Sequence, residues 1–138
     1  MTKTPKYWNK AKKYLSKKDA RMAKLIKNYQ SPSETILTTR EDVFFSLCKS
    51  IIGQQISVAA ANSVFLRFKK KCGNKINAKK VSKLTFTQIK SCGLSRQKVL
   101  GIKSLAKNIL DKSFDPKLIK KMNDEEAIEY LSSLRQIG

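Results

Sequence analysis

Apolar residues recur every three to four positions along most of the chain, and few segments alternate with a period of two. The first spacing puts apolar side chains on one face of an α-helix, whereas the second is typical of a strand. The sequence therefore predicts an all-α, multi-helix bundle with short connections. A chain of 138 residues is long enough for one hydrophobic core, and we expect residues 1–138 to form a single helical domain.

Capping residues mark the expected helix boundaries. Ser16 with Asp19, and Thr39 with Asp42, have the spacing of a capping box, in which the first residue opens the helix. Residues 31–36 are expected to be a linker. Helices are expected over residues 7–15, 17–29, 57–71, 78–83, 86–92 and 96–111, and from the Thr39–Asp42 capping box to Gly53, which ends or kinks that helix. Asp115 as cap and Pro116 as first helical residue are expected to start a short helix, and Asn123 or Asp124 to cap a last one. The buried stripe of the 57–71 helix is expected to be Val58, Ala61, Phe65 and Phe68.

The chain is strongly basic, with 30 Lys and Arg residues against 10 Asp and Glu and a net charge of +20. Such an excess attracts polyanions, of which nucleic acid is the commonest. A lysine-rich surface set by codon usage is the alternative. Charge alone leaves both interpretations open.

Histidine is absent, and the three cysteines Cys48, Cys72 and Cys92 are widely separated. This pattern excludes ordinary zinc-ligand spacing, a local iron–sulfur loop and any mechanism that uses a histidine base. We therefore expect no cofactor and no metal, and we expect Cys48 and Cys92 to act as small apolar residues. No window approaches the roughly 18 apolar residues of a membrane span. An odd cysteine count without a signal peptide fits a reducing cytosol, and a cytoplasmic, nucleoid-associated protein of the bacterial type is expected.

Two adjacent glutamines, Gln54 and Gln55, stand between an apolar and an alanine-rich run in IIGQQISVAA. A side-chain amide carries two donors and an acceptor, so the pair has no place in a hydrophobic core unless something binds it. One interpretation is that both side chains cap helix ends and bond the backbone. The other is that they contact a partner.

The run FFSLCKSIIGQQISVAAANSVFLRF resembles the first signature helix pair of the helix-hairpin-helix DNA glycosylases, and more narrowly of the 3-methyladenine glycosylase II (AlkA-type) branch. That branch carries F-x-x-L-x-x-x-I-x-G-Q-x-x-S-x-x-A-A. The matching residues here are Phe44 or Phe45, Leu47, Ile51, Gly53, Gln54, Ser57, Ala59 and Ala60.

Two further segments follow in the family's order. CGLSRQKVLGIKSLAKNI is similar to its G-L-S-x-x-K-x-x-x-I-x-x-L-A segment, through Gly93, Leu94, Ser95, Lys98, Ile102, Leu105 and Ala106. EEAIEYLSSLRQIG resembles the first helix of the hairpin. Gly138 would be the first glycine of that hairpin or lie beside it.

The resemblance gives the glutamines a role. In this family the turn between the two signature helices points at the DNA minor groove, and a side chain there fills the gap left by the flipped nucleotide. The match places this wedge at Gln55, with Gln54 beside it. Flipping costs a few kcal/mol of stacking and pairing, and an amide that enters the stack recovers part of it and can bond the orphaned base.

Four more residues join the predicted DNA-contacting set with a second interpretation open for each. Ser57 and Ser95 are expected first as helix N-caps. Arg96 and Lys98 fall in the first turn of a helix, where the dipole disfavours cations, which indicates either a nearby phosphate or simple solvent exposure. The complete set is Gln54, Gln55, Ser57, Ser95, Arg96, Lys98 and Gly138.

The resemblance implies a base excision repair glycosylase that flips and hydrolytically excises alkylated purines of the 3-methyladenine type. The implied partner is double-stranded DNA with a damaged base, the expected state is a monomer, and no membrane is involved. Two alternatives stay open. One is a basic helical DNA-binding module without catalysis, and the other is a glycosylase for oxidised or mismatched bases.

The family's catalytic aspartate lies beyond the hairpin, in a region that this sequence does not contain. We therefore assign no catalytic residue within 1–138, expect the chain to be C-terminally truncated, and expect this stretch to be inactive by itself. The acidic residues are expected to be helix caps and surface groups, among them Asp42, Asp111, Asp124, Glu125, Glu126 and Glu129.

Overall fold

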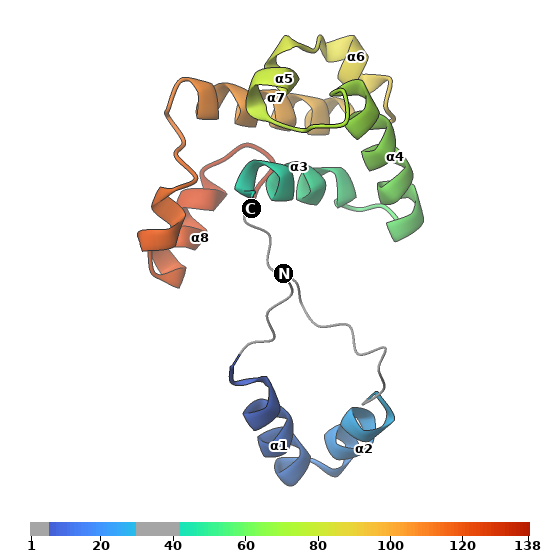
Figure 1. Cartoon of the computed structure of the whole chain (residues 1–138), viewed down its shortest axis with the longest axis vertical. Coiled ribbons are helices and arrows are strands. Elements are labelled where there is room, and N and C mark those ends of the chain that lie inside the picture. The colour runs from blue at the N-terminus through green and yellow to red at the C-terminus, as the bar shows by residue number, and fades with distance from the viewer. Residues whose placement is uncertain (1–5, 30–41) are drawn as a thin grey trace. The chain divides into compact units, whose positions relative to one another are not determined.

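A computed structural model describes residues 6–29 and 42–138. All regular secondary structure in these two ranges is helical, which confirms the expected all-α bundle. The chain divides into two compact units, Met1–Glu41 and Asp42–Gly138 (Figure 1). The expected linker at 31–36 and the expected role of Thr39 lie outside the described residues. The single-domain expectation stays a prediction.

The first unit is a pair of packed helices, α1 (Trp8–Lys18) and α2 (Ala20–Asn28). One residue separates them. The carboxylate of Asp19 accepts hydrogen bonds from the backbone N–H groups of Arg21 at 2.7 Å and Met22 at 2.9 Å. The expected capping box from Ser16 was wrong. Asp19 alone satisfies the first amides of α2, so α1 continues through Ser16 to Lys18.

The second unit opens with two longer helices, each with its own side-chain cap. Helix α3 (Val43–Gly53) is capped by Asp42, whose carboxylate accepts from the Phe45 amide at 2.9 Å. Helix α4 (Val58–Lys71) is capped by Ser57, whose hydroxyl accepts from the Ala60 amide at 3.2 Å. The predicted N-cap role of Ser57 is therefore confirmed.

The remaining α-helices also begin close to where the sequence predicted. Short helices α5 (Ala78–Lys83) and α6 (Phe86–Lys90) lead to α7 (Arg96–Leu110), capped by Ser95. A 3₁₀ turn, η1 (Leu118–Lys121), follows α7 and has no side-chain cap. The predicted helix start with Asp115 as cap and Pro116 as first residue was wrong, because the Asp115 carboxylate accepts from the Lys117 amide in a turn before η1. Helix α8 (Asp124–Ser132) comes last, and Asn123 opens it in a capping box with Glu126. Helix α6 is shorter than the expected 86–92.

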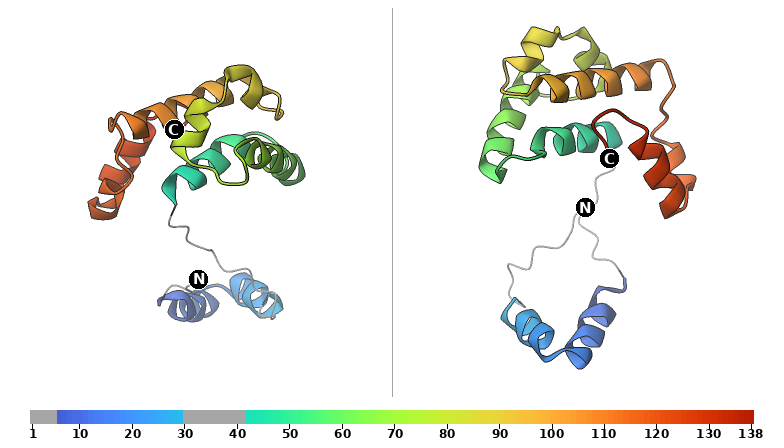
Figure 2. Two further views of the ribbon diagram at one scale, coloured as in Figure 1. Left: turned by 45° about the horizontal axis from the view of Figure 1, so that its top comes forward. Right: turned by 180° about the vertical axis from the view of Figure 1, so that it is seen from behind.

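Helix α7 lies at the centre of the second unit. It packs along α3 on one side and against α5 and α6 on another, as Figures 1 and 2 show. Their apolar faces form one core, and no polar side chain of the described residues is buried in it. Its largest fully buried side chains are Phe68, Phe114, Ile51, Ile52, Ile89 and Ile102.

The expected buried stripe of α4 was only partly right. Phe68 is buried and Phe65 packs at the edge of the core, but Val64 occupies the second buried position of the helix. Val58 is 79% exposed. Helix α4 reaches the core only with its C-terminal half, so an apolar residue at its start lies beside the α3–α4 connection with nothing over it.

Candidate nucleic-acid interface

The α3–α4 turn, residues 54–57, contains one exposed residue with an unusual backbone conformation. Gln55 is exposed and has φ of 55°, in the left-handed region that costs a residue with a Cβ about 1–2 kcal/mol. Residues held in this way concentrate at functional sites, where the surrounding structure maintains them. Gln55 keeps this unfavourable backbone conformation while its side-chain amide is free for a partner. This combination fits a site at which the side chain itself makes the contact.

Gln54 is half-buried, and its amide points away from the solvent that surrounds Gln55. Its Nε2 donates to the backbone carbonyl oxygen of Gln136 at 2.7 Å. Of the two interpretations of Gln54, the structure therefore shows the one in which its side chain bonds the backbone. The bond ties the α3–α4 turn to the C-terminal segment, residues 133–138.

The ammonium of Lys98 meets the same turn from α7. Its Nζ donates to the carbonyl oxygens of Ile52 at 2.9 Å and Gln54 at 2.7 Å. These carbonyls belong to the C-terminal end of α3, which carries the negative end of that helix dipole. A cation that is unfavourable at the start of α7 is thus favourable here. Arg96, two positions earlier, is exposed.

The C-terminal segment reaches the turn because α7 has a glycine where the two cross. A Cβ on Gly101 would lie 2.8 Å from Cγ of Gln136 and 3.5 Å from the carbonyl oxygen of Arg135. Leu134 anchors the segment in the core, and Gln136 has φ of 66°. Gly138, at the end of the segment, is exposed.

The structure therefore brings three of the predicted site residues into one network. Gln54 and Lys98 meet around the end of α3 with Gln55 next to them, and the C-terminal segment completes the contact. Ser57 caps α4, which follows the turn, and Ser95 caps α7, which carries Lys98. Sequence reasoning missed Gln136. It takes part through a backbone carbonyl, which every residue type has, so no side-chain signal could have identified it.

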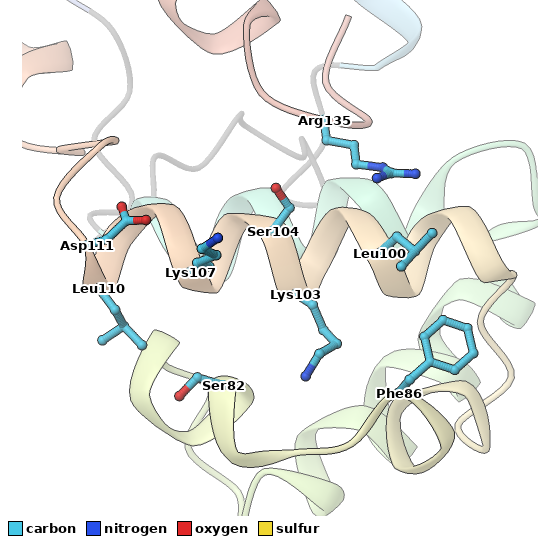
Figure 3. Close-up of a pocket in the computed structure, with 9 residues that line it drawn as sticks. All are labelled: Ser82, Phe86, Leu100, Lys103, Ser104, Lys107, Leu110, Asp111 and Arg135. Carbon is cyan, nitrogen blue, oxygen red and sulfur yellow. The ribbon is translucent and has the colours of Figure 1, made fainter.

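A separate groove of about 810 Å³ lies on the face of α7 that meets α5 and α6 (Figure 3). Phe86, Leu100 and Leu110 supply apolar surface, and Lys103, Lys107 and Arg135 supply positive charge. Two of these cations have partners: Lys103 Nζ donates to the Leu84 carbonyl at 2.6 Å, and Arg135 to the Gln97 side chain at 3.1 Å. None of the seven predicted DNA contacts lines this groove.

The described residues contain no group of three or more His, Cys, Asp or Glu placed to hold a metal ion. Cys48, Cys72 and Cys92 are free and buried in the core, which confirms that Cys48 and Cys92 pack as small apolar residues. Burial raises the pKa of all three thiols, that of Cys72 to about 11. Uncharged thiols of this kind are poor nucleophiles.

Several carboxylates have local structural roles, as expected for caps and surface groups. Asp42 caps α3, and Glu126 accepts from the backbone N–H of Asn123 at 3.0 Å. Asp111 accepts from the hydroxyl and the amide of Ser113, and these hydrogen bonds lower its pKa.

The arrangement of helices is that of a DNA glycosylase. A *Schizosaccharomyces pombe* 3-methyladenine DNA glycosylase, solved in complex with abasic DNA, superimposes with a TM-score of 0.79 at 26% identity, over 94% of this chain and 64% of that one. The family model described as HhH-GPD superfamily base excision DNA repair protein matches residues 48–136. The chain belongs to this superfamily, and the resemblance of its sequence motifs to the superfamily is confirmed.

Two curated relatives are similar over nearly all of this chain. A *Saccharomyces cerevisiae* DNA-3-methyladenine glycosylase is 32% identical over 95% of the chain and 49% of its own length. DNA-3-methyladenine glycosylase 1 of *S. pombe* is 28% identical over 86% of the chain and 52% of its own length. The chain thus spans about half the length of these relatives. Both are yeast proteins, so they give no support to the expected bacterial, nucleoid-associated location. Within the described ranges no helix is long and apolar enough to cross a membrane.

Proposed function

We propose that this chain is the DNA-engaging part of a base excision repair glycosylase that flips and hydrolytically releases alkylated purines of the 3-methyladenine type. The observation that carries the proposal is the α3–α4 turn, in which an exposed, left-handed Gln55 stands next to a fixed Gln54. The yeast relatives named for 3-methyladenine support the substrate class, and the AlkA-type Q-Q-I-S motif supports the branch.

Gln55 is the proposed wedge. Because extrusion of a nucleotide costs a few kcal/mol of stacking and pairing, a side chain that enters the vacated position stabilises the flipped state. The amide can also pair with the base left opposite the gap. The proposed partner is a double-stranded DNA with a damaged base, and the net charge of +20 supplies attraction that does not depend on sequence.

Of the remaining DNA contacts, Gln54, Ser57, Ser95, Arg96 and Gly138 stay predictions, whereas the Lys98 ammonium is bound to two backbone carbonyls. Helix N-termini bind phosphates through their free amides. This supports DNA contacts at Ser57 and Ser95, which lie at the starts of α4 and α7. Gly138 is exposed and nothing lies within 4 Å of a Cβ built on it, so DNA could approach its backbone closely.

Competition between damaged duplexes tests the substrate class. The chain is bound to a labelled duplex with one abasic site, and unlabelled duplexes carrying an alkylated purine, an oxidised purine or a mismatch are added at equal concentration. The proposal predicts that the alkylated duplex displaces the label best. Better displacement by the oxidised or mismatched duplex would favour a glycosylase for those lesions, and equal displacement by undamaged DNA would favour a non-catalytic DNA-binding module.

We further propose that residues 1–138 do not excise a base by themselves and that the chain binds DNA as a monomer. Incubation with methylated duplex DNA should release no free base, and light scattering should report a mass near 15.7 kDa. Release of 3-methyladenine by this stretch would overturn the first statement, and twice that mass would overturn the second.

A further inference from the structure

The C-terminal end of α3 is held by a cation from another helix. Lys98 stands in the first turn of α7, where the positive end of that helix dipole opposes a positive side chain. Its Nζ nevertheless lies within hydrogen-bond distance of two carbonyl oxygens, those of Ile52 and Gln54. These two acceptors take two of the three donors of the ammonium.

Gln55 directly follows Gln54, which forms hydrogen bonds with both Lys98 and Gln136. The backbone carbonyl of Gln54 is fixed by Lys98, and its side chain is fixed by the carbonyl of Gln136. Gln55 then turns into the left-handed region with its side chain exposed. A strained backbone conformation persists only when the surrounding structure holds it in place. For Gln55, the hydrogen bonds of the preceding residue, Gln54, with Lys98 and Gln136 provide that restraint.

We propose that Lys98 is a positioning residue that acts through Gln55: it fixes the end of α3 so that Gln55 keeps its left-handed conformation, and it does not bind a DNA phosphate. This inference rests on the proposed function for its consequence on DNA, since Gln55 is the proposed wedge. Arg96, in contrast, is exposed on the same turn of α7 and remains a candidate phosphate contact.

The structural part is tested without DNA by a double-mutant cycle in thermal unfolding of the 138-residue chain. Lys98→Met removes the ammonium but keeps the length of the side chain, and Gln55→Gly removes the left-handed strain. We expect Lys98→Met to lower the Tm clearly in the Gln55→Gly background and at most half as much in the wild-type background, where loss of the tie lets Gln55 leave the strained conformation and so recovers part of the cost. Arg96→Met is the matched control and should give the same small change in both.

An additive cycle, with equal Tm losses in both backgrounds, would overturn the inference and leave Lys98 as a cap of α3 only. Should Lys98→Met fail to fold, Lys98→Arg takes its place. It keeps the charge with a different donor geometry, and the same comparison across the two backgrounds applies.

The DNA part separates positioning from phosphate binding. Affinity for a duplex with one abasic site, relative to the undamaged duplex, is measured over a range of salt concentrations. Lys98→Met should reduce the abasic preference about tenfold and leave the salt slope unchanged, whereas loss of a phosphate contact lowers the slope by about one without changing the preference. The second pattern would overturn the inference. A wild-type chain with no abasic preference would contradict the proposed function instead, and the unfolding cycle would still decide the role of Lys98.

Discussion

The side-chain amide of Gln54 donates a 2.7 Å hydrogen bond to the backbone carbonyl of Gln136, 82 positions further along the chain. This bond joins the α3–α4 turn to the C-terminal segment across α7. The residue that directly follows the tied Gln54 is the exposed Gln55. The candidate interface is therefore assembled from parts far apart in the sequence, and the Gln55 side chain at its centre is exposed.

Gln55 is predicted to contribute affinity specifically for DNA that has lost a base. Gln55→Ala keeps the Cβ and hence the same backbone cost, but removes the amide. We expect its Kd for an abasic duplex to rise about tenfold, equivalent to about 1.4 kcal/mol, with little change for undamaged duplex. Fluorescence anisotropy measures both.

Gln55→Gly provides the control for backbone strain. It also lacks the amide, but glycine adopts positive φ freely, so this variant should be at least as stable as the wild type while losing the same abasic preference. If either variant bound abasic DNA as tightly as the wild type, Gln55 would not be the wedge.

Gly101 is predicted to be required for the approach of the C-terminal segment. Alanine normally stabilises a helix interior relative to glycine. Here its Cβ would lie 2.8 Å from Cγ and 3.0 Å from Cβ of Gln136, so we expect Gly101→Ala to lower the free energy of unfolding by about 1–3 kcal/mol. Urea denaturation checks this.

A second substitution, at Gln136, is predicted to restore the stability that Gly101→Ala loses. Gln136→Gly removes the clashing side chain, suits a backbone φ of 66°, and keeps the carbonyl that accepts from Gln54. The double variant Gly101→Ala, Gln136→Gly should recover the stability lost in the single one. Equal stability of Gly101→Ala and the double variant would show that the cost arises elsewhere.

The tyrosine hydroxyl of α8 is predicted to stabilise the segment that leads into η1. Tyr130 accepts a hydrogen bond from the amide of Asp115 at 2.9 Å, and its ring packs on Phe114 with 5.0 Å between centroids. Tyr130→Phe keeps the ring contact and leaves the amide without this acceptor, so we expect a loss of about 1 kcal/mol in urea denaturation. Tyr14→Phe, at a position 61% exposed, is the control and should cost nothing measurable. Equal effects of the two substitutions would contradict this role for Tyr130.

Helix limits could be predicted because side-chain caps are local. Ser57, Ser95 and Asn123 each cap a helix at or within one residue of its expected start, whereas α3 is capped by Asp42, three positions after the expected cap. Gln55 could be predicted as the wedge because the motif places it in a turn.

The hydrogen bonds around the α3–α4 turn could not be predicted in the same way. Lys98 and Gln54 bind backbone carbonyls 44 and 82 positions away, and a carbonyl leaves no mark in the sequence. The exposure of Val58 was missed for a related reason: periodicity gives the apolar face of a helix but not the point at which the core ends.

Stability is predicted to fall in alkaline solution through the buried thiols. Burial raises the pKa of Cys72 from 9.0 to about 11. Below pH 9.0 the thiol is protonated in both states. Between 9.0 and 11 the unfolded chain releases this proton while the folded chain keeps it, so the free energy of unfolding decreases as the pH rises.

Urea denaturation at several pH values from 8 to 11 should therefore give a steeper decline for the wild type than for Cys72→Ala. All other ionisable groups are the same in both proteins, so their contribution cancels in the comparison. Parallel declines would contradict a raised thiol pKa at this position.

The central claim is that this chain engages DNA at the site of a missing base through the α3–α4 turn. The most direct measurement is the ratio of its Kd values for an undamaged duplex and the same duplex with one abasic site, at physiological salt, where non-specific attraction is screened. The account predicts a ratio of about ten or more for the wild type that falls toward one in Gln55→Ala. A wild-type ratio of one would contradict it and leave a basic helical protein that binds DNA by charge alone.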